Sequence, residues 1–375
     1  MTQTDPARTA EPQDVGTAPR LMGVEEEFLL VDPGTGVASA AGGAVLLAAA
    51  AEHDTDMTGE LQREQIETGT RPKRSPADLE AELRRTRRQA RDAAAAAGAA
   101  LVPLATSPLA TRPTVSPAQR YRRMVELFGL TGSEQLTCGC HVHVAVESDE
   151  EGVGVLDRIR AWLPPLLALS SNSPYWRGED TRYASFRSQV WNRWPSAGPT
   201  AVFGSAAAYA VVEQAMLATE TVLDTGMVYF DARLSRSHPT VEIRVADVCR
   251  EIEDAVLIAT LCRALVTTAA AEWRAGMPVD PVPIEVLRLA TWRAGRSGLS
   301  EALLDPRTGR PAPARAVLDT LVDHVGDALD EAGDRDTVTT LLDGLLRRGT
   351  GAARQRAVAE RSGGDLRAVV LDAIG

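Results

Sequence analysis

Apolar and polar residues alternate along several short stretches of the chain, which is the pattern of β-strands with one buried face. Between these stretches, longer windows carry apolar residues at helical spacing. The expected strands cover residues 21–31, 63–68, 101–105, 136–146, 228–232 and 240–245, and the expected helices cover residues 40–51, 76–97, 116–128, 153–170, 203–224 and 252–275. Because strands and helices mix irregularly, without a repeating βαβ order, the pattern predicts an α+β fold with a largely antiparallel sheet.

The same pattern gives the domain organisation. Asp32-Pro33-Gly34-Thr35-Gly36 is a turn signal and predicts a hairpin after the first strand. Residues 1–19 are polar and rich in Thr and Pro, and we expect them to form a disordered leader. We expect one domain over residues 20–375, because no strong linker divides it, and its part from about residue 276 should be almost entirely helical.

Composition and charge exclude several classes of protein. The chain has 375 residues, of which 44% are hydrophobic, so it can bury a substantial core. Its net charge of −11 argues against nucleic acid or an anionic membrane as a partner. The one dense basic stretch, residues 84–91, follows glutamates and leucines at residues 79–83, and we expect it to be the solvated face of an amphipathic helix.

Cysteine usage and apolar runs indicate a cytoplasmic protein. Four cysteines without a CxxC pair are too few for a disulfide framework, which suggests a reducing compartment. The longest weakly polar run, residues 40–51, is far shorter than the roughly 20 residues that a membrane-spanning helix needs. The leader lacks the charged-then-apolar layout of a secretion signal.

The first strand carries candidate chemistry in residues 23–28, GVEEEF. Since side chains alternate along a strand, Glu25 and Glu27 share one face and Glu26 lies on the other. Two neighbouring carboxylates repel unless a cation lies between them. Taken alone, a solvated edge strand explains these residues equally well.

Two further strands place polar groups on one face. In residues 136–146, His141 and His143 share a face with Gly139, and two imidazoles on one surface suit a metal ion or a phosphate. In residues 240–245, Glu242 and Arg244 project together. Each pattern also has a simpler explanation, which is ordinary packing for the histidines and a surface ion pair for the second strand.

A fourth stretch, residues 60–67, is weaker. Gln65 and Glu67 share a face if a strand begins near residue 63, and Glu60 lies just before it. A polar loop that leads into a strand explains this stretch when it is taken alone. Together, however, the four stretches predict a sheet with one charged face. Carboxylates with an imidazole favour Mg²⁺ or Mn²⁺ over Zn²⁺.

Nucleotide phosphates are the expected ligands of the metal ions at such a site. The chain has no P-loop and no GxGxxG after a strand, so bound metal ions would have to hold the phosphates. A segment over residues 172–195 adds six of the 16 aromatic residues and four arginines. This mixture suits a site in which arginine guanidiniums bind a carboxylate and aromatic side chains form the walls. The alternative is a surface loop that its aromatic side chains hold in place.

These residues resemble the glutamate–cysteine ligase type 2 family of bacterial carboxylate–amine ligases. The resemblance covers roughly residues 20–350 and rests on residues 23–28, residues 138–143 (CGCHVH), residues 172–174 (NSP) with residues 182–191 (RYASFRSQVW), and residues 240–247 (TVEIRVAD). It implies a fold similar to the catalytic domains of glutamine synthetase and guanidino kinases, with the curved antiparallel sheet forming a funnel flanked by helices. It also implies that ATP phosphorylates a carboxylate, the γ-carboxylate of L-glutamate, and that the amine of L-cysteine or a related amine then attacks the acyl phosphate.

The resemblance also implies roles for particular residues. Arg244 would contact the transferred phosphoryl group, and Arg244 and Glu242 would be the catalytic residues. The implied metal ligands are Glu25, Glu27, Glu67, His141 and Glu242. The candidates for binding substrate or nucleotide are Arg182, Arg187, Trp191, Arg244 and His143, and the weaker site candidates are Glu60 and Gln65.

Three alternatives to a glutamate–cysteine ligase stay open at this point. The first is a related ligase with another acid and amine. The second is a metal-dependent hydrolase that uses His141 and His143, and the third is a nucleotide-binding protein without turnover. The expected partners are ATP, a divalent cation and amino acids, and a homodimer is a reasonable expectation.

Overall fold

A computed structural model of the chain describes residues 18–51 and 57–374. The expected disordered leader therefore lies almost entirely outside the described residues. The central element is an open seven-stranded sheet in the order β2-β3-β1-β5-β9-β8, with β4 paired to β1, and its neighbouring strands are antiparallel. The strands of this sheet are β1 (Met22–Val31), β2 (Met57–Gly59), β3 (Gln65–Gly69), β4 (Ala100–Val102), β5 (Gly139–Ala145), β8 (Ala232–Leu234) and β9 (Thr240–Asp247).

Helices form most of the rest of the described chain, with two small hairpins between them. The hairpins pair β6 (Tyr175–Trp176) with β7 (Glu179–Asp180), and β10 (Ala302–Leu304) with β11 (Pro311–Pro313). The helices up to the middle of the chain are α1 (Gly42–Ala50), α2 (Pro76–Ala96), α3 (Gln119–Phe128), α4 (Leu130–Glu134), α5 (Asp149–Ile159), the short 3₁₀ turn η1 (Arg160–Trp162), α6 (Leu163–Ser170) and α7 (Arg187–Trp191). The later ones are α8 (Ala206–Ala218), η2 (Thr225–Met227), α9 (Ile252–Arg274), α10 (Ile284–Ser297), α11 (Ala314–His324), α12 (Gly326–Ala332), α13 (Arg335–Arg348), α14 (Gly351–Arg361) and α15 (Leu366–Ile374).

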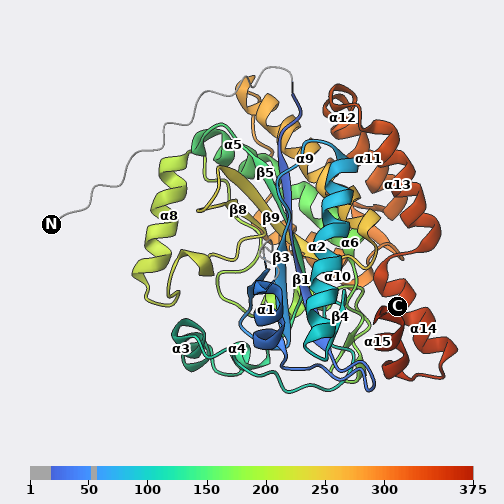
Figure 1. The fold of residues 1–375 in the computed structure, drawn as a ribbon. Coiled ribbons are helices and arrows are strands. Elements are labelled where there is room, and N and C mark those ends of the chain that lie inside the picture. The colour runs from blue at the N-terminus through green and yellow to red at the C-terminus, as the bar shows by residue number, and fades with distance from the viewer. Residues whose placement is uncertain (1–17, 52–56, 375) are drawn as a thin grey trace.

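The apolar face of the sheet packs on helices. Val142 and Val144 of β5 and Ile243 of β9 are buried in the largest core cluster, together with most of α9. Figure 1 shows the sheet nearly edge-on, with α2, α9 and α10 on one side and α3, α4 and α8 flanking the other. Among the described residues, α9 is the one helix long and apolar enough to cross a membrane, and 83% of that window is buried inside the protein. It is therefore a core helix.

The predicted α+β class with an antiparallel sheet is confirmed, and several local predictions need correction. The expected hairpin after β1 is reduced to one bridge, Val31 with Ala38, before α1 begins. Asp32 still forms the turn, because its carboxylate accepts hydrogen bonds from the N–H groups of Gly34 and Thr35 at 3.0 and 2.7 Å. The expected helix over residues 153–170 is divided into α5, η1 and α6.

The strand expected at residues 228–232 begins only at Ala232. Residues before it pair elsewhere, because Phe230 forms a bridge with Gly198 and the N–H of Asp231 donates to the Gly198 carbonyl at 2.9 Å. The C-terminal part is helical as expected, apart from the β10–β11 hairpin. The single-domain boundary stays a prediction.

Arg87 corrects the expectation that the whole basic stretch of α2 is solvated. The residue is 1% exposed, and its guanidinium donates two hydrogen bonds to Glu26, at 2.6 and 2.9 Å. It also donates to the carbonyls of Cys249 and Arg250 at 2.7 and 2.9 Å. Glu26 lies on the face of β1 opposite to Glu25 and Glu27, so this buried pair joins the sheet to α2.

We expect Glu26→Gln to lower the free energy of unfolding by about 3–5 kcal/mol, because a buried guanidinium would lose its counter-charge. Urea unfolding measures this loss. Glu80→Gln is the matched control, since Glu80 pairs with Arg84 on the exposed side of the same helix and should contribute at most about 0.5 kcal/mol. Similar small losses in both variants would contradict the assignment.

Candidate functional site

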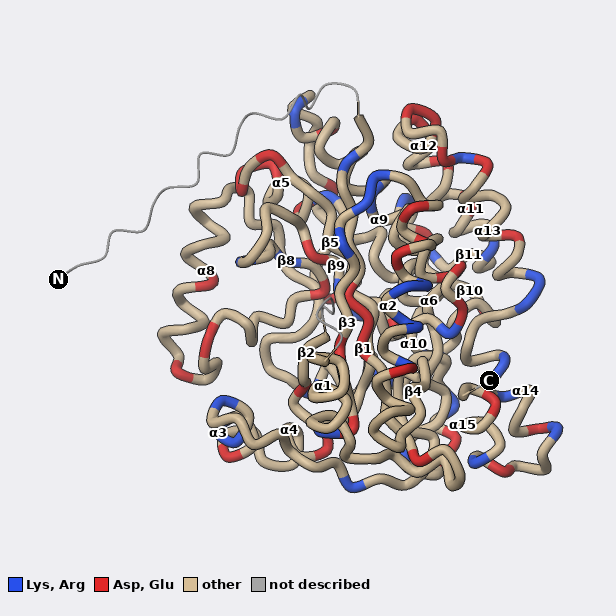
Figure 2. Tube along the Cα trace, in the orientation of Figure 1, with Lys and Arg blue, Asp and Glu red and all other residues tan. Residues whose placement is uncertain are grey.

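The strands bring the predicted site residues together by direct cross-strand pairing. Glu27 of β1 lies opposite Glu67 of β3, and Glu25 of β1 lies opposite His141 of β5. On the other side of β5, His143 lies opposite Glu242 of β9. All these residues lie on the face away from the main core, and Figure 2 shows the acidic stretch of β1 at the centre of the molecule.

This face forms the floor of a cavity of about 380 Å³. Helices α3 and α8 and the segment between β8 and β9 supply its walls. The predicted site residues that line it are Glu25, Glu27, Glu60, Gln65, Glu67, His141, His143, Trp191, Glu242 and Arg244. The cavity therefore gathers ten of the twelve predicted residues.

Three groups of side chains in the cavity have the geometry of cation sites. Within each group, one ligand atom from each residue lies within 4.8 Å of the others. The groups are Glu25 with Glu67 and His141, Glu25 with His143 and Glu242, and Glu27 with Glu60 and Glu67. Hard oxygen donors with imidazole suit Mg²⁺ or Mn²⁺.

The histidines give an independent test of this fit. Both ring nitrogens of His141 and the Nε2 atom of His143 are buried and lack a hydrogen-bond partner among the described residues. They approach Glu25 only at 3.6 Å (His141 Nδ1) and 3.3 Å (His143 Nε2). Unpartnered buried polar atoms are costly, so nitrogens aimed at a group of carboxylates fit a bound cation.

The crowded carboxylates change the pKa values of their neighbours. Burial and the charge of Glu27 raise the pKa of Glu60 to about 8, and burial with the charge of Glu60 raises the pKa of Glu67 well above its usual range. Burial would also raise the pKa of Glu25, but the nearby imidazoles of His141 and His143 outweigh it and hold this pKa well below the usual range. Without a cation, part of the cluster therefore holds protons at neutral pH.

We expect Mg²⁺ binding to the metal-free protein at pH 7 to release protons, because Glu60 is mostly protonated below its pKa of about 8 and must lose its proton to bind a cation. The apparent affinity should rise by up to about tenfold per pH unit between pH 6 and 8. Calorimetric titration in buffers of different ionisation enthalpy measures this release, and Glu60→Gln should reduce it. An affinity independent of pH, with no proton release, would contradict the cluster.

Arg244 and Arg233 hold Glu242 from two sides. Arg233 makes a two-point ion pair with the Glu242 carboxylate, at 2.7 and 3.2 Å, and Arg244 Nη1 contacts Oε1 of the same carboxylate. Burial would raise the pKa of Glu242, but the charges of Arg244 and Arg233 hold it well below its usual range. Arg244 also lies over the Trp191 ring, 5.7 Å from its centroid. Its orientation is thus fixed on two sides.

Arg233 is a site residue that the sequence analysis missed. The strand was expected to end at residue 232, one residue before Arg233. The sequence therefore did not predict that Arg233 lies opposite Glu242. Most of the cavity wall outside the four strands was missed as well, although Trp191 was predicted and Trp194 belongs to the aromatic segment. The missed lining residues include Arg120, Tyr121, Tyr229 and His238.

Gln65 lines the cavity, and its side chain also has a structural role. Its amide nitrogen donates to the Thr137 carbonyl at 2.7 Å and lies 3.4 Å from the sulfur of Cys138. It therefore ties the start of β3 to the segment that leads into β5.

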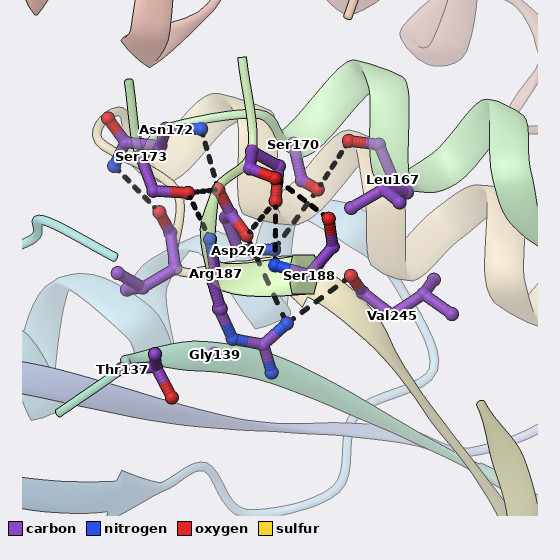
Figure 3. A network of polar contacts seen from close by, with 12 residues as sticks. Thr137, Gly139, Leu167, Ser170, Asn172, Ser173, Arg187, Ser188, Val245 and Asp247 are labelled. Carbon is purple, nitrogen blue, oxygen red and sulfur yellow. Dashed lines mark hydrogen bonds and ion pairs between the residues drawn. The ribbon is translucent and has the colours of Figure 1, made fainter. Parts of the chain in front are cut away.

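Arg187 lies behind the cavity rather than in its lining. Its guanidinium rests on Gly139, where an added Cβ would collide with it, and it forms a 4.0 Å ion pair with Asp247. Figure 3 shows the network around Asp247, whose buried carboxylate also accepts from Ser173 Oγ at 2.7 Å and from the N–H of Asn172 at 2.8 Å. Arg187 thus braces the loop after α6 against β5 and β9.

Arg182 does not reach the cavity either. It is exposed and lines a separate surface hollow with Arg296 and Arg356. The aromatic and arginine-rich segment is therefore divided, with Trp191 and Trp194 in the cavity wall and Arg182 outside it. The expectation of one carboxylate pocket built from this whole segment is wrong, because Arg182 and Tyr183 line the surface hollow while Trp191 and Trp194 line the cavity.

Comparisons with known proteins show which family this chain belongs to. The family model described as glutamate–cysteine ligase family 2 matches residues 21–372. A relative from Frankia alni, provisionally named glutamate–cysteine ligase 2-2, is 51% identical over 92% of this chain and 94% of its own length. A relative from Streptomyces avermitilis, provisionally named glutamate–cysteine ligase 2-1, is 52% identical over 95% of this chain and 98% of its own length.

Two solved structures share the fold. A glutamate–cysteine ligase from Francisella tularensis, solved in complex with AMP, matches with a TM-score of 0.67 at 14% identity, over 95% of this chain and 87% of its own. A bifunctional glutathione synthetase from Pasteurella multocida matches with a TM-score of 0.65 at 15% identity, over 95% of this chain, which spans about half (52%) of that longer protein. At these identities the likeness concerns the fold alone. From the family match and the close relatives, this chain belongs to the glutamate–cysteine ligase family 2.

Proposed function

We propose that this protein is an ATP-dependent carboxylate–amine ligase that joins the γ-carboxylate of L-glutamate to the amine of L-cysteine or a related amine. In the proposed reaction, the carboxylate takes the γ-phosphoryl group of ATP and ADP is released. The amine then attacks the acyl phosphate, an amide bond forms, and phosphate leaves. The observation that carries this proposal is the convergence of glutamates from β1, β3 and β9 on one cavity with Arg244 beside them.

The proposed cation ligands are Glu25, Glu27, Glu67, His141 and Glu242, with Glu60 as a weaker candidate beside Glu27 and Glu67. Bound divalent cations would neutralise charge on phosphate oxygens and align them for transfer. Arg244 is proposed to contact the transferred phosphoryl group, because a guanidinium fork matches phosphate oxygens. The ion pair with Glu242 and the contact with the Trp191 ring would keep this guanidinium in place.

Substrate binding is proposed for fewer residues than the sequence indicated. Trp191 and His143 stay candidates, because both line the cavity. Arg187 and Arg182 are left out of direct contact with substrate, since both side chains lie outside it. Glutamate and cysteine are supported by the family and by the names of the relatives, and another acid–amine pair is the main alternative. The homodimer and the cytoplasmic location stay predictions.

ADP release across a panel of amino-acid pairs, with and without Mg²⁺, tests the proposal. A glutamate–cysteine ligase should release ADP only when glutamate, cysteine and Mg²⁺ are all present, with γ-glutamylcysteine as product. Release with another pair would keep the ligase and change its substrates. Turnover without ATP would indicate a hydrolase, and ATP binding without release for any pair would indicate a nucleotide-binding protein.

A further inference from the structure

A second hollow, of about 200 Å³, lies at the surface where residues 182–184 meet the end of α10 and the middle of α14. It shares no lining residue with the cavity described above. Its lining residues are Arg182, Tyr183, Ala184, Arg296, Ser297, Ser300 and Arg356. We propose that this hollow binds a small oxyanion of phosphate size.

Two of its three guanidiniums are held in place by other groups. Arg296 lies over the Tyr183 ring, 5.6 Å from the centroid, and Arg356 lies over the Tyr175 ring at 5.7 Å. Each also donates a hydrogen bond to the backbone, Arg296 to the carbonyl of Arg182 and Arg356 to the carbonyl of Tyr183. Since a guanidinium has five N–H donors, both keep donors for a ligand. Guanidiniums that are already fixed lose little freedom when they bind an oxyanion.

Arg182 supplies the third positive charge. Its side chain donates no hydrogen bond to any residue in the described ranges, and it is exposed at the rim of the hollow. The loop brings it there by a tight turn, in which the N–H of Arg182 donates to Asp180 Oδ1 at 2.8 Å. An oxyanion in the hollow would therefore give this free guanidinium a partner.

Two carboxylates that contact lining residues of the hollow already have partners. Asp180 accepts from Arg356 at 2.6 Å, and Glu301 accepts from Ser297 at 2.8 Å. The carbonyls of Gly295 and Arg296, at the negative end of α10, accept from the N–H of Ala184 at 3.0 and 3.2 Å. The residues that line the hollow include three arginines and no carboxylate, so the hollow keeps an excess of positive charge.

The ligand class follows from the donor set. Several N–H groups around a hollow of this size suit the oxygens of phosphate or of a phosphate monoester. Both sources share the same chemistry, so the test must separate free phosphate from a phosphate group on a nucleotide. Binding at the metal-binding cavity must not contribute to the measured signal. The acidic floor of that cavity should repel phosphate when divalent cations are removed.

Calorimetric titration with inorganic phosphate, and separately with AMP, in chloride buffer with EDTA tests the proposal. Wild-type protein should bind at one site, and Arg182→Ala should weaken binding about tenfold, which is the effect expected from losing one charge-assisted contact. Arg288→Ala is the matched control, because Arg288 is exposed on α10 outside the hollow. It should bind like the wild type.

The pair of ligands identifies the source. AMP binding that Arg182→Ala weakens would support a phosphate-monoester site, and binding of inorganic phosphate alone would support a free-phosphate site. No binding of either ligand by the wild type would overturn the proposal. Equal binding by wild type, Arg182→Ala and Arg288→Ala would also overturn it, and equal melting temperatures would establish that the variants are folded.

Discussion

Glu27→Gln is expected to lower ADP release at saturating Mg²⁺ by at least about 100-fold, because it removes a carboxylate from the proposed cation site. Glu27 lies opposite Glu67, belongs to the group with Glu60, and is 7% exposed. Its Oε2 atom also accepts from the N–H of Gly139 at 2.5 Å. The amide oxygen of glutamine can keep this hydrogen bond but carries no full charge for a cation.

The same substitution should leave the metal-free protein at least as stable as the wild type. The charge of Glu27 contributes to the raised pKa values of Glu60 and Glu67, so its removal relieves repulsion. Urea unfolding in EDTA measures this stability, and coupled-enzyme assays measure ADP release.

The neighbouring residue supplies the control. Glu26 faces α2 and not the cavity, so Glu26→Gln should lose stability while its folded fraction keeps wild-type turnover. Wild-type ADP release by Glu27→Gln, or equal losses of turnover in the two variants, would contradict the assignment of the two faces.

Arg244→Lys is expected to lower kcat by about 100-fold while the Kd for ATP changes by less than about threefold. A fixed donor aimed at charge that develops in the transition state acts mainly on turnover, and removing one such donor typically costs 10²–10³ in kcat. Lysine keeps the charge but cannot reproduce the planar fork that Glu242 and Trp191 hold in position.

Steady-state turnover and equilibrium ATP binding, measured on the same preparation, separate the two quantities. Arg236→Lys is a useful comparison, because Arg236 also lines the cavity but pairs with Glu213 in its wall. Parallel losses of kcat and ATP affinity in Arg244→Lys would indicate a role in ground-state binding and contradict the one proposed here.

The sequence predicted best on which face of its strand each side chain lies. Alternation along a strand is a local property, so the separation of Glu25 and Glu27 from Glu26 followed directly from residues 23–28. The same applies to Glu242 and Arg244 opposite Ile243. The α+β class followed from the irregular order of elements.

Pairing between strands could not be predicted in the same way. The register that places Glu25 opposite His141, and His143 opposite Glu242, depends on residues about a hundred positions apart. Alternation predicted one charged face shared by these strands, and the family resemblance supplied which of its residues bind metal. The structure adds that β5 and β9 shift register between Cys140 and Val142, which no local pattern indicates.

The arginines were the least predictable residues. Arg87 lies in a basic stretch whose sequence predicts a solvated helix face. Its burial depends on Glu26, which is far away in the sequence and lies on β1. Arg187 and Arg182 belong to one short segment, yet one braces Asp247 and the other reaches a separate hollow. A guanidinium on a long side chain suits a buried ion pair, a ligand contact or the surface, so its partners decide its role.

In the function that we propose, glutamates from neighbouring strands gather divalent cations in one cavity. Anomalous diffraction from crystals grown with Mn²⁺ and ATP tests it most directly. We expect Mn²⁺ peaks about 2 Å from carboxylate oxygens of Glu27, Glu67 and Glu242. Mn²⁺ found only outside the cavity, with these carboxylates free of metal, would contradict the claim.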